Sequence, residues 1–123
     1  MLERVTLLPG DFLADSLPTD QDIILAFNVI HGLSDEQNRL LFERLLSALT
    51  TGGRLYVLDQ LRPSGRRSSL EGFLPLMVGL NLLHEIGGGV YDRDDVIRWS
   101  GRARTVRKRR LWIPGVSLLE IVK

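Results

Sequence analysis

The sequence predicts an α/β fold, in which a partial, mostly parallel sheet carries flanking helices and ends in an antiparallel strand pair. Two observations support this class: apolar runs typical of buried strands alternate with amphipathic stretches of helical period, and a Pro-Gly turn separates the last two strand-like runs. The 123 residues are 44% hydrophobic and 25% charged, which suits one modest core, so we predict a single domain over residues 1–123.

The chain begins with two predicted strands. Residues 4–8 are a short strand candidate, and Pro9-Gly10 ends it because this pair favours a turn. Residues 22–30 read DIILAFNVI, an almost continuous apolar run that is typical of a central parallel strand covered on both faces.

A helix is expected over residues 35–49. Ser34 and Gln37 have the spacing of a capping box, and Gly52-Gly53 supplies a stop signal. Four leucines recur on one face of this helix, namely Leu40, Leu41, Leu45 and Leu49. Residues 54–59 (RLYVLD) then predict a second buried strand, which completes a strand–helix–strand crossover.

Two further helices are expected after a polar loop. Residues 70–86 carry apolar side chains at helical spacing up to a cluster of three glycines. Residues 92–99 form a shorter helix, in which Asp92 is the cap and Asp95 has the position to complete a box-like arrangement.

The last two strands are expected over residues 105–112 and 117–122, joined by Pro114-Gly115 as an antiparallel pair. Six of the nine residues from 102 to 110 are cationic. We favour a strand whose cations face water over a phosphate-binding patch, because no aromatic side chains alternate with these cations.

The composition argues against several partners. Sixteen basic and fifteen acidic residues leave a net charge of +1, so we predict neither a nucleic-acid partner nor attraction to a membrane surface. The absence of cysteine excludes disulfides and thiolate metal sites, and we predict no metal site. With no secretory signal and no apolar stretch of about 18 residues, we predict a cytoplasmic protein.

Five segments follow one another in a characteristic order: RVTLLPGDF, DIILAFNVIHGLSDEQNRLLFERLLSAL, TTGGRLYVLDQLRP, LNLLHEIGGGVYDRDDVIRW and PGVSLLEIVK. This series resembles the small-molecule O-methyltransferases of plants and bacteria, class I enzymes that depend on S-adenosylmethionine (SAM). The resemblance implies the C-terminal part of their Rossmann-like catalytic domain, from the third to the seventh strand of a sheet with order 3-2-1-4-5-7-6. The glycine-rich cofactor loop of that domain has no counterpart in this chain.

His31 and Asp59 are the candidate catalytic residues. Each directly follows or ends a predicted parallel strand, at the carboxyl edge where such sheets bind ligands. The resemblance implies that His31 is the general base and that Asp59 orients it. The alternatives are a loop histidine before a helix cap and a solvated aspartate at a strand end.

The resemblance also implies cofactor and acceptor residues. Asp11 and Phe12 match a pair that binds the adenine of SAM, and Phe27 with Asn28 matches positions near the cofactor; a turn aspartate beside a core phenylalanine is the alternative for the first pair. The expected acceptor-binding residues lie on the helix over residues 70–86, whose apolar stripe alternatively belongs to the core: Phe73, Met77, Leu80 and His84. A second carboxylate of the family is replaced here by Tyr91.

Three hypotheses about function remain open at this point. The first is an O-methyltransferase acting on a small aromatic or polyketide-like molecule; the second is a non-catalytic interaction or dimerisation module derived from such an enzyme; the third is a truncated or split product that another chain completes. Without the first two strands of the family, one edge of residues 22–30 has unpaired backbone groups. We therefore expect a homodimer, or pairing with another chain through this edge.

Overall fold

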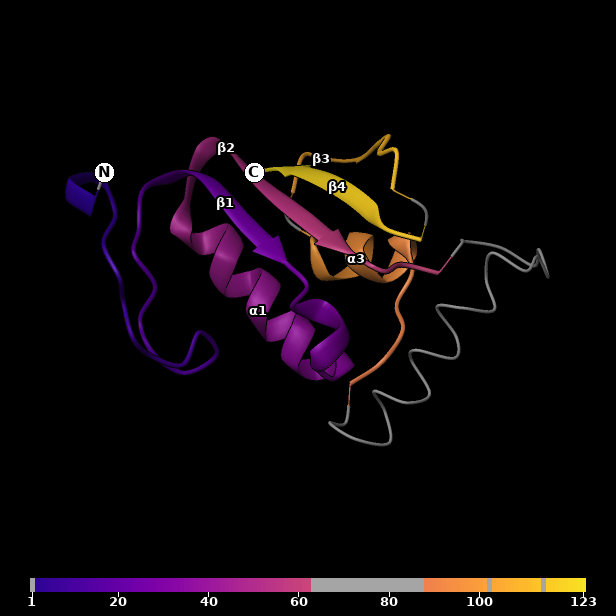
Figure 1. Ribbon diagram of the computed structural model, residues 1–123, viewed down its shortest axis with the longest axis horizontal. Coiled ribbons are helices and arrows are strands. Elements are labelled where there is room, and N and C mark those ends of the chain that lie inside the picture. Colours follow the sequence, from indigo (N-terminus) through magenta and orange to yellow (C-terminus); the bar gives the residue numbers. More distant parts are fainter. Residues whose placement is uncertain (1, 63–87, 102, 114) are drawn as a thin grey trace.

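The computed structural model describes residues 2–62, 88–101, 103–113 and 115–123. Its four-stranded sheet has the order β1-β2-β4-β3, and α1 and α3 lie on the same face of it (Figure 1). The elements are β1 (Gln21–Phe27), α1 (Asp35–Ala48), β2 (Leu49–Asp59), α3 (Arg93–Trp99), β3 (Thr105–Arg109) and β4 (Ser117–Val122), with short 3-10 turns at Leu2–Arg4 and Ile30–Gly32. β1 is parallel to β2, and β4 is antiparallel to β2 and β3. The α/β class and the closing antiparallel pair are therefore confirmed, and the order matches 4-5-7-6 of the resembling family.

The core lies between the sheet and the two helices. Side chains from every one of these layers are fully buried: Leu41 and Phe42 of α1, Leu55 and Val57 of β2, Val96 of α3, and Leu119 and Ile121 of β4. The Phe42 and Trp99 rings join the two helices, with centroids 5.4 Å apart. Removal of this apolar surface from water is the main driving force for folding.

The strand predicted over residues 4–8 is wrong. Between the 3-10 turn at Leu2–Arg4 and the start of β1 at Gln21 the chain forms no helix or strand, and Leu7 is 86% exposed. A strand persists only where its backbone N–H and C=O groups find partners. None of the four described strands pairs with this segment.

β1 is shorter and less covered than the predicted strand over residues 22–30. It ends at Phe27 and pairs with β2 alone, so it is an edge strand of the described sheet. Ala26 is buried in the core, but Ile23 and Leu25 on the opposite face are 58% and 62% exposed. The prediction of a central strand covered on both faces is wrong for the described part of the chain, because α1 and α3 cover only one face.

α1 begins as predicted but is rotated relative to the predicted leucine face. The capping box is confirmed: the Gln37 amide donates to the Ser34 hydroxyl (3.2 Å), and the Ser34 amide donates to the Gln37 side chain (2.9 Å). Leu40 is on the exposed side of the helix. Leu41 and Leu45 are buried as predicted. The full set of buried positions on the helix is Asn38, Leu41, Phe42, Leu45, Leu46 and Ala48.

The predicted helix stop at Gly52-Gly53 is wrong. α1 ends at Ala48, β2 begins at Leu49 without a loop, and both glycines lie inside β2. Gly52 has a positive φ of 81°, and a Cβ added at Gly53 would lie 2.9 Å from the Thr50 carbonyl oxygen. These glycines therefore fit a local irregularity, where the register between β1 and β2 also shifts.

α3 forms where the sequence predicts a helix. The Asp95 amide donates to the Asp92 carboxylate (3.0 Å), and the Asp92 amide donates to the Asp95 carboxylate (2.9 Å), which confirms the box-like cap. The helix predicted over residues 70–86 lies outside the described residues. No helix in the described part of the chain is long and apolar enough to cross a bilayer.

The β3–β4 hairpin is confirmed, but β3 ends at Arg109 rather than at residue 112. The last register pair joins Arg109 to Leu118, and because β4 begins at Ser117 it has no residue opposite positions 111 and 112. Gly115 has a positive φ of 75°, which the turn between the strands requires. All five described cations of the basic run are exposed, as the sequence predicts, namely Arg104, Arg107, Lys108, Arg109 and Arg110.

A buried glutamate on β4 is surrounded by partners from neighbouring strands. Glu120 is 3% exposed and accepts hydrogen bonds from Arg109 Nε (2.7 Å) and the Tyr56 hydroxyl (3.2 Å), with Arg54 Nε at 3.5 Å. Burial raises the pKa of Glu120, but the contacts with Arg109 and Tyr56 and the charge of Arg54 outweigh this effect. The net pKa is therefore lowered, and the carboxylate stays ionised.

Replacing Glu120 by glutamine removes the negative charge that Arg54 and Arg109 contact. Near pH 7 this should lower the free energy of unfolding by an amount at the lower end of the range of about 1.5–3 kcal/mol that is usual for hydrogen bonds to charged groups. The loss is limited because both arginines are half-exposed and can bind water in place of the carboxylate. The pKa of Glu120 in the folded state is below its ordinary value of 4.5, so the ionised carboxylate adds stability above pH 4.5. This stability is lost as the pH falls through the folded-state pKa. In urea titrations, the difference between parent and variant should therefore shrink as the pH is lowered. Exposed Glu36, changed to glutamine, is the control; a difference that stays constant down to acid pH would contradict this account.

Candidate functional site

His31 lies at the edge where β1 and β2 end. Asn28 directly follows β1 with a positive φ of 54°, and its amide donates to the Leu58 carbonyl (2.8 Å). Asparagine tolerates this left-handed conformation better than most residues, so the chain turns out of the sheet at this point. The following 3-10 turn, Ile30–Gly32, carries His31 to the end of β2 at Asp59.

The His31 ring and the Asp59 carboxylate form a direct pair. Nδ1 of His31 lies 2.8 Å from Oδ1 of Asp59. The aspartate side chain is 1% exposed, whereas the histidine side chain is 30% exposed, so the pair has a buried and an accessible member. An ionised carboxylate only accepts, so in the neutral imidazole Nδ1 carries the hydrogen and Nε2 keeps its lone pair.

Asp59 also holds the backbone around this pair. Its Oδ2 accepts from the Ile30 amide (3.1 Å), and its Oδ1 accepts from the Gln60 amide (2.8 Å) as well as from His31. Three donors compensate the buried charge, as a buried carboxylate requires. The alternative of a solvated aspartate at the strand end therefore does not describe this residue.

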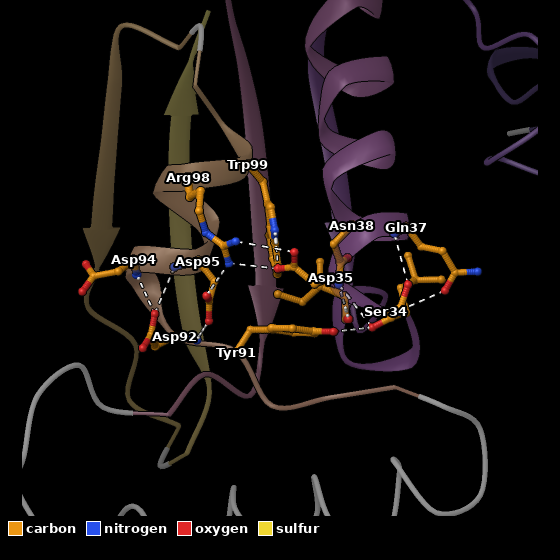
Figure 2. A network of polar contacts seen from close by, with 12 residues as sticks. Ser34, Asp35, Gln37, Asn38, Tyr91, Asp92, Asp94, Asp95, Arg98 and Trp99 are labelled. Carbon is orange, nitrogen blue, oxygen red and sulfur yellow. Dashed lines mark hydrogen bonds and ion pairs between the residues drawn. The ribbon is translucent and has the colours of Figure 1, made fainter.

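Two side chains that the sequence did not predict as site residues bind the turn that carries His31. Nδ2 of Asn38 donates to the carbonyls of Ile30 (2.9 Å) and Leu33 (3.4 Å), and the Tyr91 hydroxyl donates to the Leu33 carbonyl (2.7 Å). Figure 2 shows the Tyr91 hydroxyl pointing at the start of α1, beside Ser34 and Asn38. A polar residue on the apolar face of α1 was the available signal for Asn38, which is fully buried.

An ion-pair network joins the start of α1 to α3 next to this turn (Figure 2). Arg98 donates to Asp35 (2.9 Å) and Asp95 (2.7 Å), and the Trp99 indole donates to Asp35 (3.0 Å). The hydrogen bond from Arg98 lowers the pKa of Asp35. Burial raises the pKa of Tyr91, so its hydroxyl stays protonated and able to donate. The network connects α1, which carries Asn38, to α3, which begins just after Tyr91.

Adding a methyl group at Gly88 should displace the His31 turn. A Cβ at this buried glycine would overlap the His31 carbonyl oxygen, which also accepts from the Gly89 amide (3.1 Å). Because both contacts involve backbone, neither segment can yield by a rotamer change alone. We expect Gly88→Ala to lower the free energy of unfolding by about 1–3 kcal/mol or more in urea titrations.

The matched control for Gly88→Ala is Gly101→Ala. A Cβ at Gly101 would have its nearest neighbour, the Arg98 carbonyl oxygen, at 3.6 Å, an ordinary contact. This variant should therefore stay within about 0.5 kcal/mol of the parent. Equal losses in the two variants would show that the approach of Gly88 to His31 carries no particular cost.

The predicted adenine-binding pair lies on a turn beside α1. Oδ1 of Asp11 accepts from the Leu13 amide (2.8 Å), and Arg44 Nε donates to the Phe12 carbonyl (3.1 Å). In Figure 1 the indigo segment before β1 runs along the side of α1 away from α3. The Phe12 ring is 44% exposed, so it is not a core phenylalanine.

The other predicted binding residues divide into two groups. Phe27, 43% exposed, and Asn28 lie at the end of β1, but no described contact joins them to Asp11 or Phe12. The predicted acceptor-binding residues lie outside the described residues, namely Phe73, Met77, Leu80 and His84. Within the described ranges, no group of three or more His, Asp or Glu side chains is arranged to hold a metal ion.

Comparisons with known proteins agree on one family. A family model described as an O-methyltransferase domain matches residues 1–97. The aclacinomycin 10-hydroxylase RdmB of Streptomyces purpurascens is 34% identical over 103 residues, which are 84% of this chain and 27% of that protein. The 3-amino-4-hydroxybenzoate 4-O-methyltransferase of Streptomyces cremeus is 34% identical over 97 residues, 78% of this chain and 25% of that protein. The chain thus spans about a quarter of the length of these curated relatives.

A solved structure shares the fold. The human N-acetylserotonin methyltransferase in complex with SAM superposes with a TM-score of 0.83 at 23% sequence identity. The match covers 98% of this chain and 34% of that chain. The arrangement of strands and helices in Figure 1 is therefore that of one part of a larger fold.

Proposed function

This chain belongs to the O-methyltransferase domain family, and from that membership we propose that residues 1–123 are the C-terminal part of a SAM-dependent catalytic domain that methylates a hydroxyl group. The observation that carries the proposal is the His31–Asp59 pair, 2.8 Å apart at the carboxyl edge of the sheet. Membership alone does not fix the reaction, because one relative is named a hydroxylase. A base at this edge favours transfer to a hydroxyl, which must lose its proton.

In the proposed mechanism, His31 is the general base and Asp59 is its positioning residue. Bound SAM would supply a methyl group on a sulfonium. Nε2 of His31 would take the proton that the acceptor hydroxyl loses as its oxygen replaces sulfur on that methyl group. The Asp59 carboxylate, hydrogen-bonded to Nδ1, stabilises the imidazolium that results.

The residues proposed to hold the cofactor fit its adenine in their chemistry. One oxygen of Asp11 is engaged by the Leu13 amide, and the second is an acceptor of the kind that the adenine amino group needs. The partly exposed Phe12 ring offers an apolar face to a flat heterocycle, and Phe27 and Asn28 supply further contacts at the end of β1.

The proposed acceptor is a small aromatic or polyketide-like molecule. One relative is named for a hydroxybenzoate acceptor, in which an aromatic ring carries the methylated oxygen. Apolar side chains such as Phe73, Met77 and Leu80 would suit such a ring, and the imidazole of His84 would suit a polar group on it. The predicted cytoplasmic location remains a prediction.

We also propose that β1 pairs with a second copy or another chain. Among the described residues the strand is paired along one edge, and its outward face exposes Ile23, Leu25 and Phe27. An apolar edge strand of this kind tends to recruit a neighbouring strand. Sedimentation should show a dimer or a higher assembly, and Leu25→Lys should weaken it. A monomer at high concentration would contradict this pairing.

The exposed apolar stripe of β1 also favours a second candidate function, a non-catalytic interaction or dimerisation module. Calorimetric titration of the chain with SAM and with S-adenosylhomocysteine separates the two functions. Saturable binding, followed by a methylated product from phenolic acceptors, supports the enzyme. Folded protein that binds neither ligand supports the module.

The calorimetry has a matched pair of variants. Asp11→Asn should weaken SAM binding if this carboxylate holds the adenine amino group. Asp94→Asn changes an exposed aspartate in the first turn of α3 and should leave binding unchanged. Equal affinities for the two variants would remove Asp11 from the proposed cofactor site.

A further inference from the structure

We propose that Asn38 and Tyr91 are positioning residues for His31: they fix the backbone of its turn, so that the imidazole meets Asp59 through Nδ1. The inference rests on the proposed function only for the use of His31 as a base. Its geometry is independent of any ligand. Neither residue touches the imidazole ring in the described contacts; both act on the carbonyls of the turn.

The backbone of the turn is held by donors from distant segments. The Ile30 carbonyl accepts from Asn38, the His31 carbonyl accepts from the Gly89 amide, and the Leu33 carbonyl accepts from both Asn38 and Tyr91. A 3-10 turn of three residues has few hydrogen bonds of its own. Its orientation therefore depends on these external donors.

Stability alone does not explain an asparagine at position 38. The residue is fully buried on the apolar face of α1, and its Oδ1 has no hydrogen-bond partner among the described residues. A buried acceptor without a donor is unfavourable, and a leucine at this place would remove that cost. The presence of an asparagine here is therefore best explained by its side-chain N–H groups, which donate to the carbonyls of the turn.

Tyr91 places its hydroxyl through the core. Its ring packs edge-on against Trp99, with centroids 4.8 Å apart and an interplanar angle of 75°. Trp99 is in turn held by its indole hydrogen bond to Asp35. The phenol thus has little freedom to move away from the Leu33 carbonyl, at 2.7 Å (Figure 2). A rigid donor of this kind can define the position of the turn.

The test is the tautomer of His31, read from long-range proton–nitrogen correlations of the imidazole in the full chain. The chain has two histidines, and His84→Gln identifies the signals of His31. In the parent, the signals should be those of the Nδ1–H tautomer. In Asn38→Leu with Tyr91→Phe, they should shift to those of an unrestrained imidazole, in which the Nε2–H tautomer predominates.

The single variants keep the test valid if the double variant does not fold. In Asn38→Leu, the Ile30 carbonyl still accepts from the Leu33 amide (3.3 Å). The Leu33 carbonyl still accepts from the Tyr91 hydroxyl. In Tyr91→Phe, only one oxygen is removed and Asn38 still reaches the Leu33 carbonyl. Each single variant should therefore fold and show a partial shift of the His31 signals.

Two controls separate positioning from general loss of stability. Tyr56→Phe removes a hydroxyl that binds Glu120, away from the turn. Leu41→Ala opens a cavity in the core without removing a polar contact. Both should retain the Nδ1–H signals in the folded protein.

The outcomes distinguish this inference from the proposed function. Folded Asn38 and Tyr91 variants that keep the Nδ1–H signals overturn the positioning role, whatever the chain methylates. A parent without the Nδ1–H signals also overturns it. If the His31 signals shift in the variants but the chain binds no SAM, the shift supports the positioning role. The absence of SAM binding then counts against the proposed function only.

Discussion

Replacing Phe42 by alanine is expected to lower the free energy of unfolding by about 3–5 kcal/mol. The Phe42 side chain is 0% exposed and packs at the junction of α1, α3 and the sheet, against the Trp99 ring. Truncation removes apolar burial and leaves a cavity that its neighbours fill only in part. For a chain of 123 residues, whose total stability is typically about 6–18 kcal/mol, this is a large fraction.

Urea titration followed by tryptophan fluorescence measures this loss. The chain has two tryptophans, of which Trp99 is buried beside Phe42 and Trp112 is fully exposed. The matched control is Leu40→Ala on the opposite side of α1, which should change the free energy of unfolding by about 0.5 kcal/mol or less. Equal losses at the two positions would contradict the rotated helix face.

The contrast between Phe42 and Leu40 shows where the sequence is insufficient. The leucine pattern predicts a face that contains Leu40, because Leu40 is grouped with Leu41, Leu45 and Leu49. The face that is buried depends on where the sheet and α3 lie, and no local pattern contains that information. The aromatic residue of the helix takes the central core position.

Features that depend on contacts within a few residues were predicted correctly. Both capping boxes are present, at Ser34 with Gln37 and at Asp92 with Asp95, because their donors and acceptors are three residues apart. The strand predicted over residues 4–8 was not: this segment has strand composition, but none of the four described strands pairs with it.

The candidate site divides in the same way. The proximity of His31 and Asp59 follows from a rule of topology, since the carboxyl ends of neighbouring parallel strands meet at one edge. Tyr91 and Leu33 are 58 residues apart in sequence, and their contact depends on how α3 packs against α1. No spacing in the sequence predicts that contact, so Tyr91 was singled out only because it replaces a family carboxylate.

Replacing His31 by glutamine is expected to lower kcat for methyl transfer by about 10²- to 10⁴-fold, the usual contribution of a general base. Glutamine retains an amide that can donate to Asp59, so the buried carboxylate keeps a partner. It has no basic nitrogen to take the proton of the acceptor. The loss should therefore appear in turnover, measured with saturating SAM and an acceptor that the chain methylates.

The control for His31→Gln is the SAM affinity of the same variant, measured by calorimetry. This affinity should be unchanged, because the proposed cofactor contacts are made by other residues. Asp59→Asn should have a smaller effect on kcat than His31→Gln, because it leaves the imidazole in place and removes only its orientation and the compensating charge. If His31→Gln retains near-normal turnover and tight SAM binding, His31 is not the base. The Asp59 carboxylate would then serve only the backbone, through the Ile30 and Gln60 amides that it already binds.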